Sequence, residues 1–237
     1  MTTMLGKLYL IPTTLGDTEP LEVMPISVKK VIEKLDYFIV ENEKTARRYI
    51  KKITPTKAQS SLNFMMIDKY SHELETRNYL DICNEGVSVG ILSEAGVPGI
   101  ADPGATVVKQ AHEKGIQVIP LVGPSSILLA MMASGMNGQN FSFNGYLPID
   151  KADRKKKIKE LERLSRDKDQ TQIFIETPYR NEKMLDQLKS SLSPNTYLCV
   201  ACDISLPTEY IKTLTINEWK SEKPDLHKRP AIFIIQA

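Results

Sequence analysis

The sequence predicts an α/β protein of two domains, the first built on a mainly parallel sheet with helices on both faces and the second on a mixed sheet. Strand-like and helix-like segments alternate through the first two-thirds of the chain, whereas the last strands follow one another with few helices between them. A turn-rich link at residues 135–140 separates these two patterns. We therefore expect an N-terminal domain at 1–139 and a C-terminal domain at 140–237, with a ligand cleft between them.

The elements of the N-terminal half follow from apolar runs and helical spacing. Short apolar, β-rich runs predict strands at 7–11, 37–40, 62–67, 87–92 and 116–119. Apolar residues at helical spacing predict helices at 28–35, 45–53, 74–83, 105–114 and 128–133, with Ser125 as an N-cap before the last. Strands separated by helices imply right-handed crossovers and a mainly parallel sheet.

The C-terminal half begins with an apolar stretch and a basic helix. Its remaining elements are expected to be strands at 141–146, 172–175, 196–202, 208–214 and 230–235, with helices from 151 and at 182–191. Because few helices separate the late strands, antiparallel neighbours are expected and the sheet is predicted to be mixed.

Bulk composition is that of an ordinary globular protein. Of 237 residues, 41% are hydrophobic and 25% charged, and the net charge is only +2. We expect a soluble, cytoplasmic protein with no membrane partner, because no apolar run approaches membrane-spanning length and the first residues lack signal-peptide order.

Cysteines and histidines give little support to a metal or redox site. Cys199 and Cys202 form a C-x-x-C, but it lies inside an expected buried strand, where side chains three apart point to opposite faces. Cys83 and the three histidines stand singly. We therefore predict no metal ion and no disulfide framework.

The most informative segment is the loop at 93–104, Ser-Glu-Ala-Gly-Val-Pro-Gly-Ile-Ala-Asp-Pro-Gly. Its glycines and prolines exclude a continued helix or ordinary strand pairing. It is much longer than the usual strand-to-helix connection and follows an apolar strand, the position at which open α/β sheets bind ligands. We interpret it as a ligand-binding loop.

Three further Gly/Pro/Thr/Ser-rich loops follow predicted strands, at 12–17, 120–126 and 176–179. The first two should meet the 93–104 loop at one edge of the parallel sheet, and the last should face them from the second domain. Asp17, Glu94 and Asp102 would add carboxylates to such a site. The chain has neither G-x-G-x-x-G after its first strand nor G-x-x-x-x-G-K-[ST], so dinucleotide and NTP binding are poorly supported.

Positive charge is concentrated at 151–159, where six Lys or Arg residues accompany a single acid. Such a run can form an RNA-binding surface, but taken alone it is more typical of a solvated helix face whose apolar stripe packs inward.

Four motifs in order resemble the tetrapyrrole methylase family, the class III S-adenosylmethionine-dependent methyltransferases. They are the 93–104 loop, Pro-Leu-Val-Gly-Pro-Ser at 120–125, Gly-Tyr-Leu-Pro at 145–148 before the basic helix, and Phe-Ile-Glu-Thr-Pro-Tyr-Arg at 174–180. They are most similar to the branch that methylates a ribose 2′-hydroxyl of small-subunit ribosomal RNA.

The resemblance implies a homodimer with S-adenosylmethionine in the cleft between the domains. The cofactor contacts that it implies are Leu15, Glu94, Gly96, Val97, Pro98, Ser125, Ser126, Ile127, Glu176, Thr177, Pro230 and Ala231. RNA phosphates would be held by Arg47, Lys155, Lys156, Lys157 and Arg180. A base that accepts the hydroxyl proton is expected among Asp17, Glu41 and Glu43.

The chain departs from that branch at three places. Glu94 replaces an Asp, Leu-Gly-Asp at 15–17 replaces an I-G-N-type ending, and residues 41–47 replace an E-D-T-R motif. It also lacks the C-terminal segment of longer members. Two alternatives to the RNA methyltransferase therefore stay open: a methyltransferase acting on a corrin precursor, another small molecule or a protein, and a non-catalytic RNA-binding protein of this fold.

Overall fold

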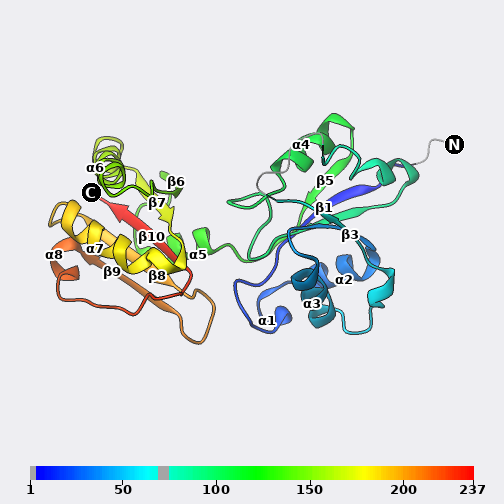
Figure 1. Cartoon of the computed structure of the whole chain (residues 1–237), viewed down its shortest axis with the longest axis horizontal. Helices are drawn as coiled ribbons and strands as arrows, with labels where there is room; N and C mark the ends of the chain where they lie inside the picture. The colour runs from blue at the N-terminus through cyan, green and yellow to red at the C-terminus, as the bar shows by residue number, and fades with distance from the viewer. Residues whose placement is uncertain (1–3, 69–74) are drawn as a thin grey trace. The chain divides into compact units, whose positions relative to one another are not determined.

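A computed structural model describes residues 4–68 and 75–237, and they form two compact units, Met1–Ser125 and Ser126–Ala237 (Figure 1). Each unit has its own five-stranded sheet and hydrophobic core. Among the described residues, no helix has both the length and the apolar character needed to cross a membrane.

The first unit contains the predicted parallel sheet. Its strand order is β3-β2-β4-β1-β5, and every pairing is parallel. The strands are β1 (Lys7–Ile11), β2 (Tyr37–Val40), β3 (Asn63–Met66), β4 (Val89–Leu92) and β5 (Gln117–Pro120). All five lie within the predicted ranges or extend one residue beyond them, which shows how well short apolar runs mark buried parallel strands.

Helices cover both faces of this sheet, as predicted (Figure 1). They are α1 (Pro20–Val23), α2 (Ile26–Lys34), α3 (Glu43–Ile53), α4 (Ala105–Glu113) and the 3-10 turns η1 (Gln59–Ser61) and η2 (Asp81–Glu85). Apolar residues of α2 and α3 pack into the core on one face, whereas those of α4 and η2 pack into the core on the other.

The helix predicted at 74–83 is not formed in its described part. Residues 75–80 are turns that lead into η2, and residue 74 lies outside the described residues. The backbone N–H groups of Tyr79 and Asp81 donate to carbonyls three residues earlier, as in 3-10 turns. Thr76 is fully buried and bonds Gln110 of α4, so its side chain is held by a tertiary contact that apolar spacing does not reveal.

The second unit contains the predicted mixed sheet, in the order β6-β7-β10-β8-β9. Only β6 and β7 pair in parallel. Its strands are β6 (Phe141–Tyr146), β7 (Thr171–Ile175), β8 (Tyr197–Cys202), β9 (Tyr210–Thr215) and β10 (Ala231–Gln236). Its helices are α5 (Ser126–Ser134), α6 (Lys151–Lys168), α7 (Asn181–Ser191), α8 (Ile216–Trp219) and the 3-10 turn η3 (Pro178–Arg180). Helices α6, α7 and α8 enclose one core against the sheet.

The boundary between the units falls between Ser125 and Ser126 rather than between residues 139 and 140. Helix α5 accounts for the difference, because it packs on β8, β9 and β10 of the second sheet. Thr213 of β9 also donates a hydrogen bond to the carbonyl of Ser134, at 2.8 Å. The turn-rich link that follows α5 therefore lies inside the second unit.

Candidate functional site

Three of the Gly/Pro-rich loops meet at the carboxyl edge of the first sheet. The N–H of Thr13, after β1, donates to the carbonyl of Gly96, after β4, at 2.9 Å. A side chain at Gly96 would lie 3.2 Å from Leu15 and 3.3 Å from the carbonyl of Pro124, after β5. These contacts bring together loops that the sequence placed at one edge.

The 93–104 loop is a shaped structure held by its own hydrogen bonds. The Ser93 hydroxyl is buried and donates to the carbonyl of Gly96. Gly96 has φ +76° and Gly104 has φ +127°, a left-handed region that favours glycine. The glycines therefore allow a backbone path in which main chain without a side chain lies close to the neighbouring loops.

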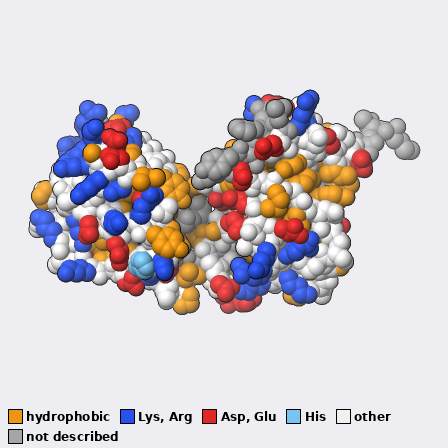
Figure 2. Space-filling view, viewed as in Figure 1, with side chains coloured by type: hydrophobic (Ala, Val, Ile, Leu, Met, Phe, Trp, Pro, Cys, Tyr) orange, Lys and Arg blue, Asp and Glu red, His pale blue; other side chains and the backbone are white. Residues whose placement is uncertain are grey.

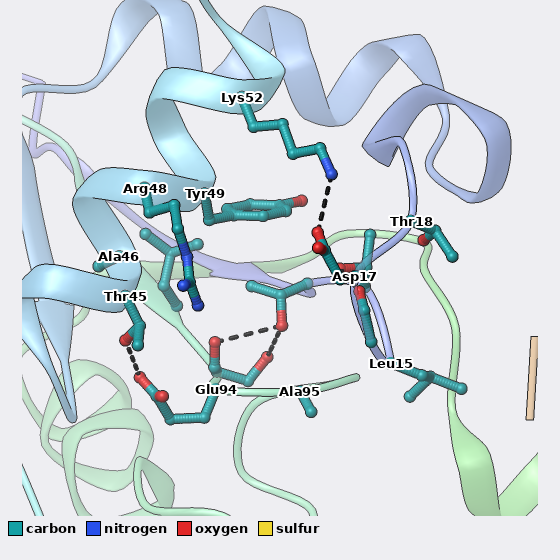
Figure 3. A pocket seen from close by; sticks show the side chains of 15 residues that line it. Leu15, Asp17, Thr18, Thr45, Ala46, Arg48, Tyr49, Lys52, Glu94 and Ala95 are labelled. Atoms are coloured by element: carbon teal, nitrogen blue, oxygen red, sulfur yellow. Dashed lines mark hydrogen bonds and ion pairs between the residues drawn. The ribbon is translucent and has the colours of Figure 1, made fainter. Parts of the chain in front are cut away.

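A cavity of about 350 Å³ opens between α3 and the loops that follow β1 and β4 (Figure 3). Its lining residues come from the loop after β1, from one face of α3 and from the start of the 93–104 loop: Thr13, Thr14, Leu15, Gly16, Asp17, Thr18, Thr45, Ala46, Arg48, Tyr49, Lys52, Leu92, Ser93, Glu94 and Ala95. Asn42 caps α3 by accepting from the N–H groups of Lys44 and Thr45. Thr45 in turn donates to Glu94 at 2.6 Å, which ties the helix to the loop.

Two carboxyl groups near Glu94, which lines this cavity, have raised pKa values. Burial, followed by the charges of Asp102, Glu94 and Asp68, raises the pKa of Glu41 to about 7. Burial and the charge of Glu94 raise the pKa of Asp102 to about 6. Glu41 directly follows β2 and is half-buried, so it carries a group that titrates near neutral pH at the sheet edge.

The other two predicted bases have ion-pair partners. The Nζ of Lys52 lies 3.0 Å from Oδ1 of Asp17 and 3.3 Å from Oε1 of Glu19. The hydrogen bond that Lys52 donates to Asp17 keeps the pKa of Asp17 below its usual value. Glu43 pairs with Arg47 at 2.7 Å. A carboxylate with a lowered pKa is a weak proton acceptor, so Asp17 is poorly suited to the role.

Arg47, predicted to bind phosphate, is directed away from the cavity. Its guanidinium bonds Glu43 and the carbonyl of Gln59, each at 2.7 Å, and lies over the ring of Phe64. Arg48 lines the cavity instead, and Figure 3 shows its side chain reaching in from α3. Helical spacing in the sequence could have predicted which residues of α3 line the cavity. They share one face of the helix: Thr45, Arg48, Tyr49 and Lys52.

Predicted site residues in the second unit lie at the end of β7. Glu176 is buried, and its Oε1 accepts from the N–H of Thr177 at 2.7 Å and from Arg180 at 2.6 Å. Its other oxygen, Oε2, is buried and has no hydrogen-bond partner among the described residues. Ala231 begins β10, beside the exposed Pro230.

The remaining predicted contacts are spread over both units. Val97 and Pro98 continue the 93–104 loop, and Pro98 also lines a second, apolar cavity of about 250 Å³. Ser125 directly precedes α5, which begins at Ser126, and Ile127 in its first turn is largely buried. In α6, Lys155 and Lys156 are exposed, whereas Lys157 is half-buried and pairs with Glu160 at 2.8 Å. Over residues 4–68 and 75–237, no group of three or more His, Cys, Asp or Glu is arranged to hold a metal ion.

Comparison with known proteins finds similarity along nearly the whole chain. Residues 7–219 match the family model described as "Tetrapyrrole (Corrin/Porphyrin) Methylases". Proteins named "Ribosomal RNA small subunit methyltransferase I" are similar along nearly the entire chain. The one from Vibrio cholerae is 28% identical over 96% of this chain and 76% of its own. The one from Bacillus subtilis is 27% identical over 92% of this chain and 71% of its own.

Two solved structures share the fold. The methyltransferase CobJ superposes with a TM-score of 0.65 at 16% identity, over 98% of this chain and 94% of its own. The cobalt precorrin-4 methyltransferase CbiF superposes with a TM-score of 0.60 at 16% identity, over 97% and 94%.

Proposed function

The chain belongs to the tetrapyrrole (corrin/porphyrin) methylase family and is a methyltransferase, and from this premise we propose that it transfers a methyl group from S-adenosylmethionine to a ribose 2′-hydroxyl of small-subunit ribosomal RNA. The relatives named for small-subunit ribosomal RNA support this substrate over nearly the full chain. The likeness to CobJ and CbiF supports the fold alone.

The residues present fit S-adenosylmethionine. In the first unit, a side chain at Gly96 would meet Leu15 and the carbonyl of Pro124, so glycine lets the main chain of this loop lie close to two neighbouring loops, which suits a ligand held by main-chain groups. In the second unit, Oε2 of Glu176 is buried with no hydrogen-bond partner in the described part of the chain, so it offers an acceptor for a hydroxyl or ammonium donor. When bound, the sulfonium supplies an activated methyl group, so the protein's main task is to align the acceptor oxygen.

Glu41 is the base that this site supports best. A ribose hydroxyl gains nucleophilicity when a positioned carboxylate accepts its proton, and an acceptor with a pKa near the working pH does this most effectively. The raised pKa of Glu41, about 7, is the single observation that carries this assignment. Asp17 and Glu43, with their ion-pair partners, would hold neighbouring cations instead.

The basic residues would hold phosphates on either unit. Arg48 and Lys52 line the cavity of the first unit, and Lys155 and Lys156 are exposed on α6. Arg180 is held against Glu176, so we assign it to organising the end of β7 as well as to carrying positive charge. Each phosphate contact would be independent of sequence and sensitive to salt.

We also propose that the protein is a homodimer. Leu128 and Met132 lie one turn apart on α5 and have exposed fractions of 53% and 78% in the single chain, and neighbouring exposed apolar side chains of this kind are typical of an interface between subunits. Light scattering of the purified protein would give twice the chain mass of 26.7 kDa if this is correct.

Methyl transfer from radiolabelled S-adenosylmethionine tests the function. Small ribosomal subunits lacking this modification, cell metabolites and cell proteins are offered separately, with the Glu41→Gln variant as a matched control. Label in small-subunit RNA, mapped to a ribose oxygen and lost with Glu41→Gln, is the expected result. Label in metabolites or proteins would replace the RNA assignment, and binding of RNA without binding of S-adenosylmethionine would support the non-catalytic alternative.

A further inference from the structure

Two exposed tyrosines lie at the same edge of the second sheet. Tyr146 ends β6 and Tyr179 lies in η3, just after β7, with exposed fractions of 61% and 71%. Strands β6 and β7 are parallel neighbours, and Tyr146 pairs in register with Ile175. Large aromatic side chains normally bury most of their surface, so two at one edge that remain exposed require an explanation.

The backbone is shaped to present each ring. The pairing of β6 with β7 shifts register between Phe143 and Tyr146, and Gly145 in this irregularity has φ +62°. A bulge of this kind changes the direction of the side chain that follows it. Tyr146 is thereby exposed, while the next residue, Leu147, is buried in the core.

Lys228 supports the second ring from a strained backbone position. It has φ +58°, which non-glycine residues rarely adopt, and its N–H donates to the carbonyl of Pro178 at 3.2 Å. Its ammonium lies 5.9 Å from the centre of the Tyr179 ring. Strain of this type persists where neighbouring structure enforces it, and it is frequent at ligand sites.

Positive charge surrounds the same edge. Helix α6 begins at Lys151, shortly after Tyr146, and its first turns carry the exposed Lys155 and Lys156. Figure 2 shows Lys and Arg side chains gathered over this helix. Exposed aromatic rings beside a basic surface are the combination by which proteins hold unpaired nucleotides, because rings stack on bases and cations take phosphates.

We propose that Tyr146 and Tyr179 form a stacking platform for unpaired bases of the RNA substrate, with Lys228 and the first turns of α6 beside its phosphates. The platform rests on the proposed function for the identity of the RNA. It adds to that function the requirement that the bound segment present unstacked bases, so a fully paired helix would bind less tightly at this edge.

Binding of a short, single-stranded, fluorescently labelled RNA tests the platform by anisotropy. Tyr146→Ala and Tyr179→Ala should each weaken binding by about tenfold, within the range known for loss of one aromatic–base stack. The Phe variants should bind like the unchanged protein, because the ring is kept. Tyr197→Ala is the matched control: Tyr197 is also exposed on this sheet, but it begins β8, which runs in the same direction as β7, so it lies at the opposite edge.

An abasic RNA of the same length separates stacking from charge. The two Ala variants should bind it as well as the unchanged protein does, whereas Lys228→Gln should lower the salt dependence on both RNAs by about one phosphate contact. Equal binding of the normal RNA by the Ala variants and Tyr197→Ala, or an equal loss on abasic RNA, would overturn the platform. Absence of methyl transfer to small-subunit RNA by the unchanged protein overturns the proposed function instead, so the two failures remain distinguishable.

Discussion

Two adjacent arginines on α3 have different roles because a helix directs successive side chains about 100° apart. Arg47 packs over Phe64 and bonds Glu43 and Gln59, whereas Arg48 lines the cavity. We expect Arg48→Met to weaken RNA binding several-fold, with little change in the free energy of unfolding. We expect Arg47→Met to lower the free energy of unfolding by about 1 kcal/mol, because it removes a cation–π contact and a bond to a carbonyl.

Urea unfolding and RNA binding, measured on both variants, check this pair. Each variant removes one positive charge from neighbouring positions of the same helix, so each controls for the general loss of charge in the other. Reversed effects, with stability lost in Arg48→Met and binding lost in Arg47→Met, would contradict the assignment of the cavity-facing residue.

We expect Glu41 to make both activity and stability depend on pH. Its pKa is about 7 in the folded protein against a usual value of 4.5, so the folded state binds the proton more tightly than the unfolded chain does. The free energy of unfolding should therefore fall as pH rises from about 4.5 to about 7. Each pKa unit is worth about 1.4 kcal/mol, and solvent screening at this half-buried position reduces the fall to ~1–2 kcal/mol.

In the proposed mechanism, the same carboxyl accepts the hydroxyl proton only when it is ionised. The value of kcat/KM should therefore rise through pH ~7, and Glu41→Gln should lower it by ~10²–10⁴-fold and reduce the stability loss. Methyl-transfer rates and urea midpoints at pH 5 and pH 8 are the measurements, with Glu33→Gln on the surface of α2 as the control. A Glu41→Gln enzyme with the full rate would exclude this base.

Among the secondary-structure elements, α3 forms one wall of the cavity, and its N-terminus holds that wall in place. Asn42 accepts from two N–H groups of the first turn, and the turn carries Thr45, which holds Glu94. Asn42→Ala should cost about 1 kcal/mol of unfolding free energy and raise KM, while Asn42→Ser should retain both because serine also caps helices. Thermal unfolding and steady-state kinetics test this. Unchanged KM in the Ala variant would show that the cap does not position the cavity wall.

The sequence was most informative about elements and their edges. Short apolar runs located the parallel strands, and the rule that their carboxyl ends share an edge predicted the meeting of the loops around Gly96. The roles of individual residues were harder to predict from the sequence. Arg48 reaches the cavity because of the direction in which its position on α3 points its side chain. Glu41 owes its raised pKa partly to Asp68, Glu94 and Asp102, which follow β3 and β4 and are distant from it in sequence. Helix α5 joined the second unit through tertiary packing that local composition does not encode.

For the whole molecule, the distribution of charge matters more than its sum, since the net charge is only +2. Reversing Lys155, Lys156 and Lys157 to Glu places negative charge on the exposed face of α6, although the present pairing of Lys157 with Glu160 lessens that residue's share. RNA binding should weaken by tenfold or more and lose part of its salt dependence, because fewer counterions are released per complex. Affinity for S-adenosylmethionine, measured by calorimetry, should stay unchanged. The matched control reverses Lys29, Lys30 and Lys34 of α2, which changes the net charge equally on the other unit. If both triple variants bind RNA equally weakly, overall charge governs the encounter, and the assignment of α6 as the RNA-binding helix is wrong.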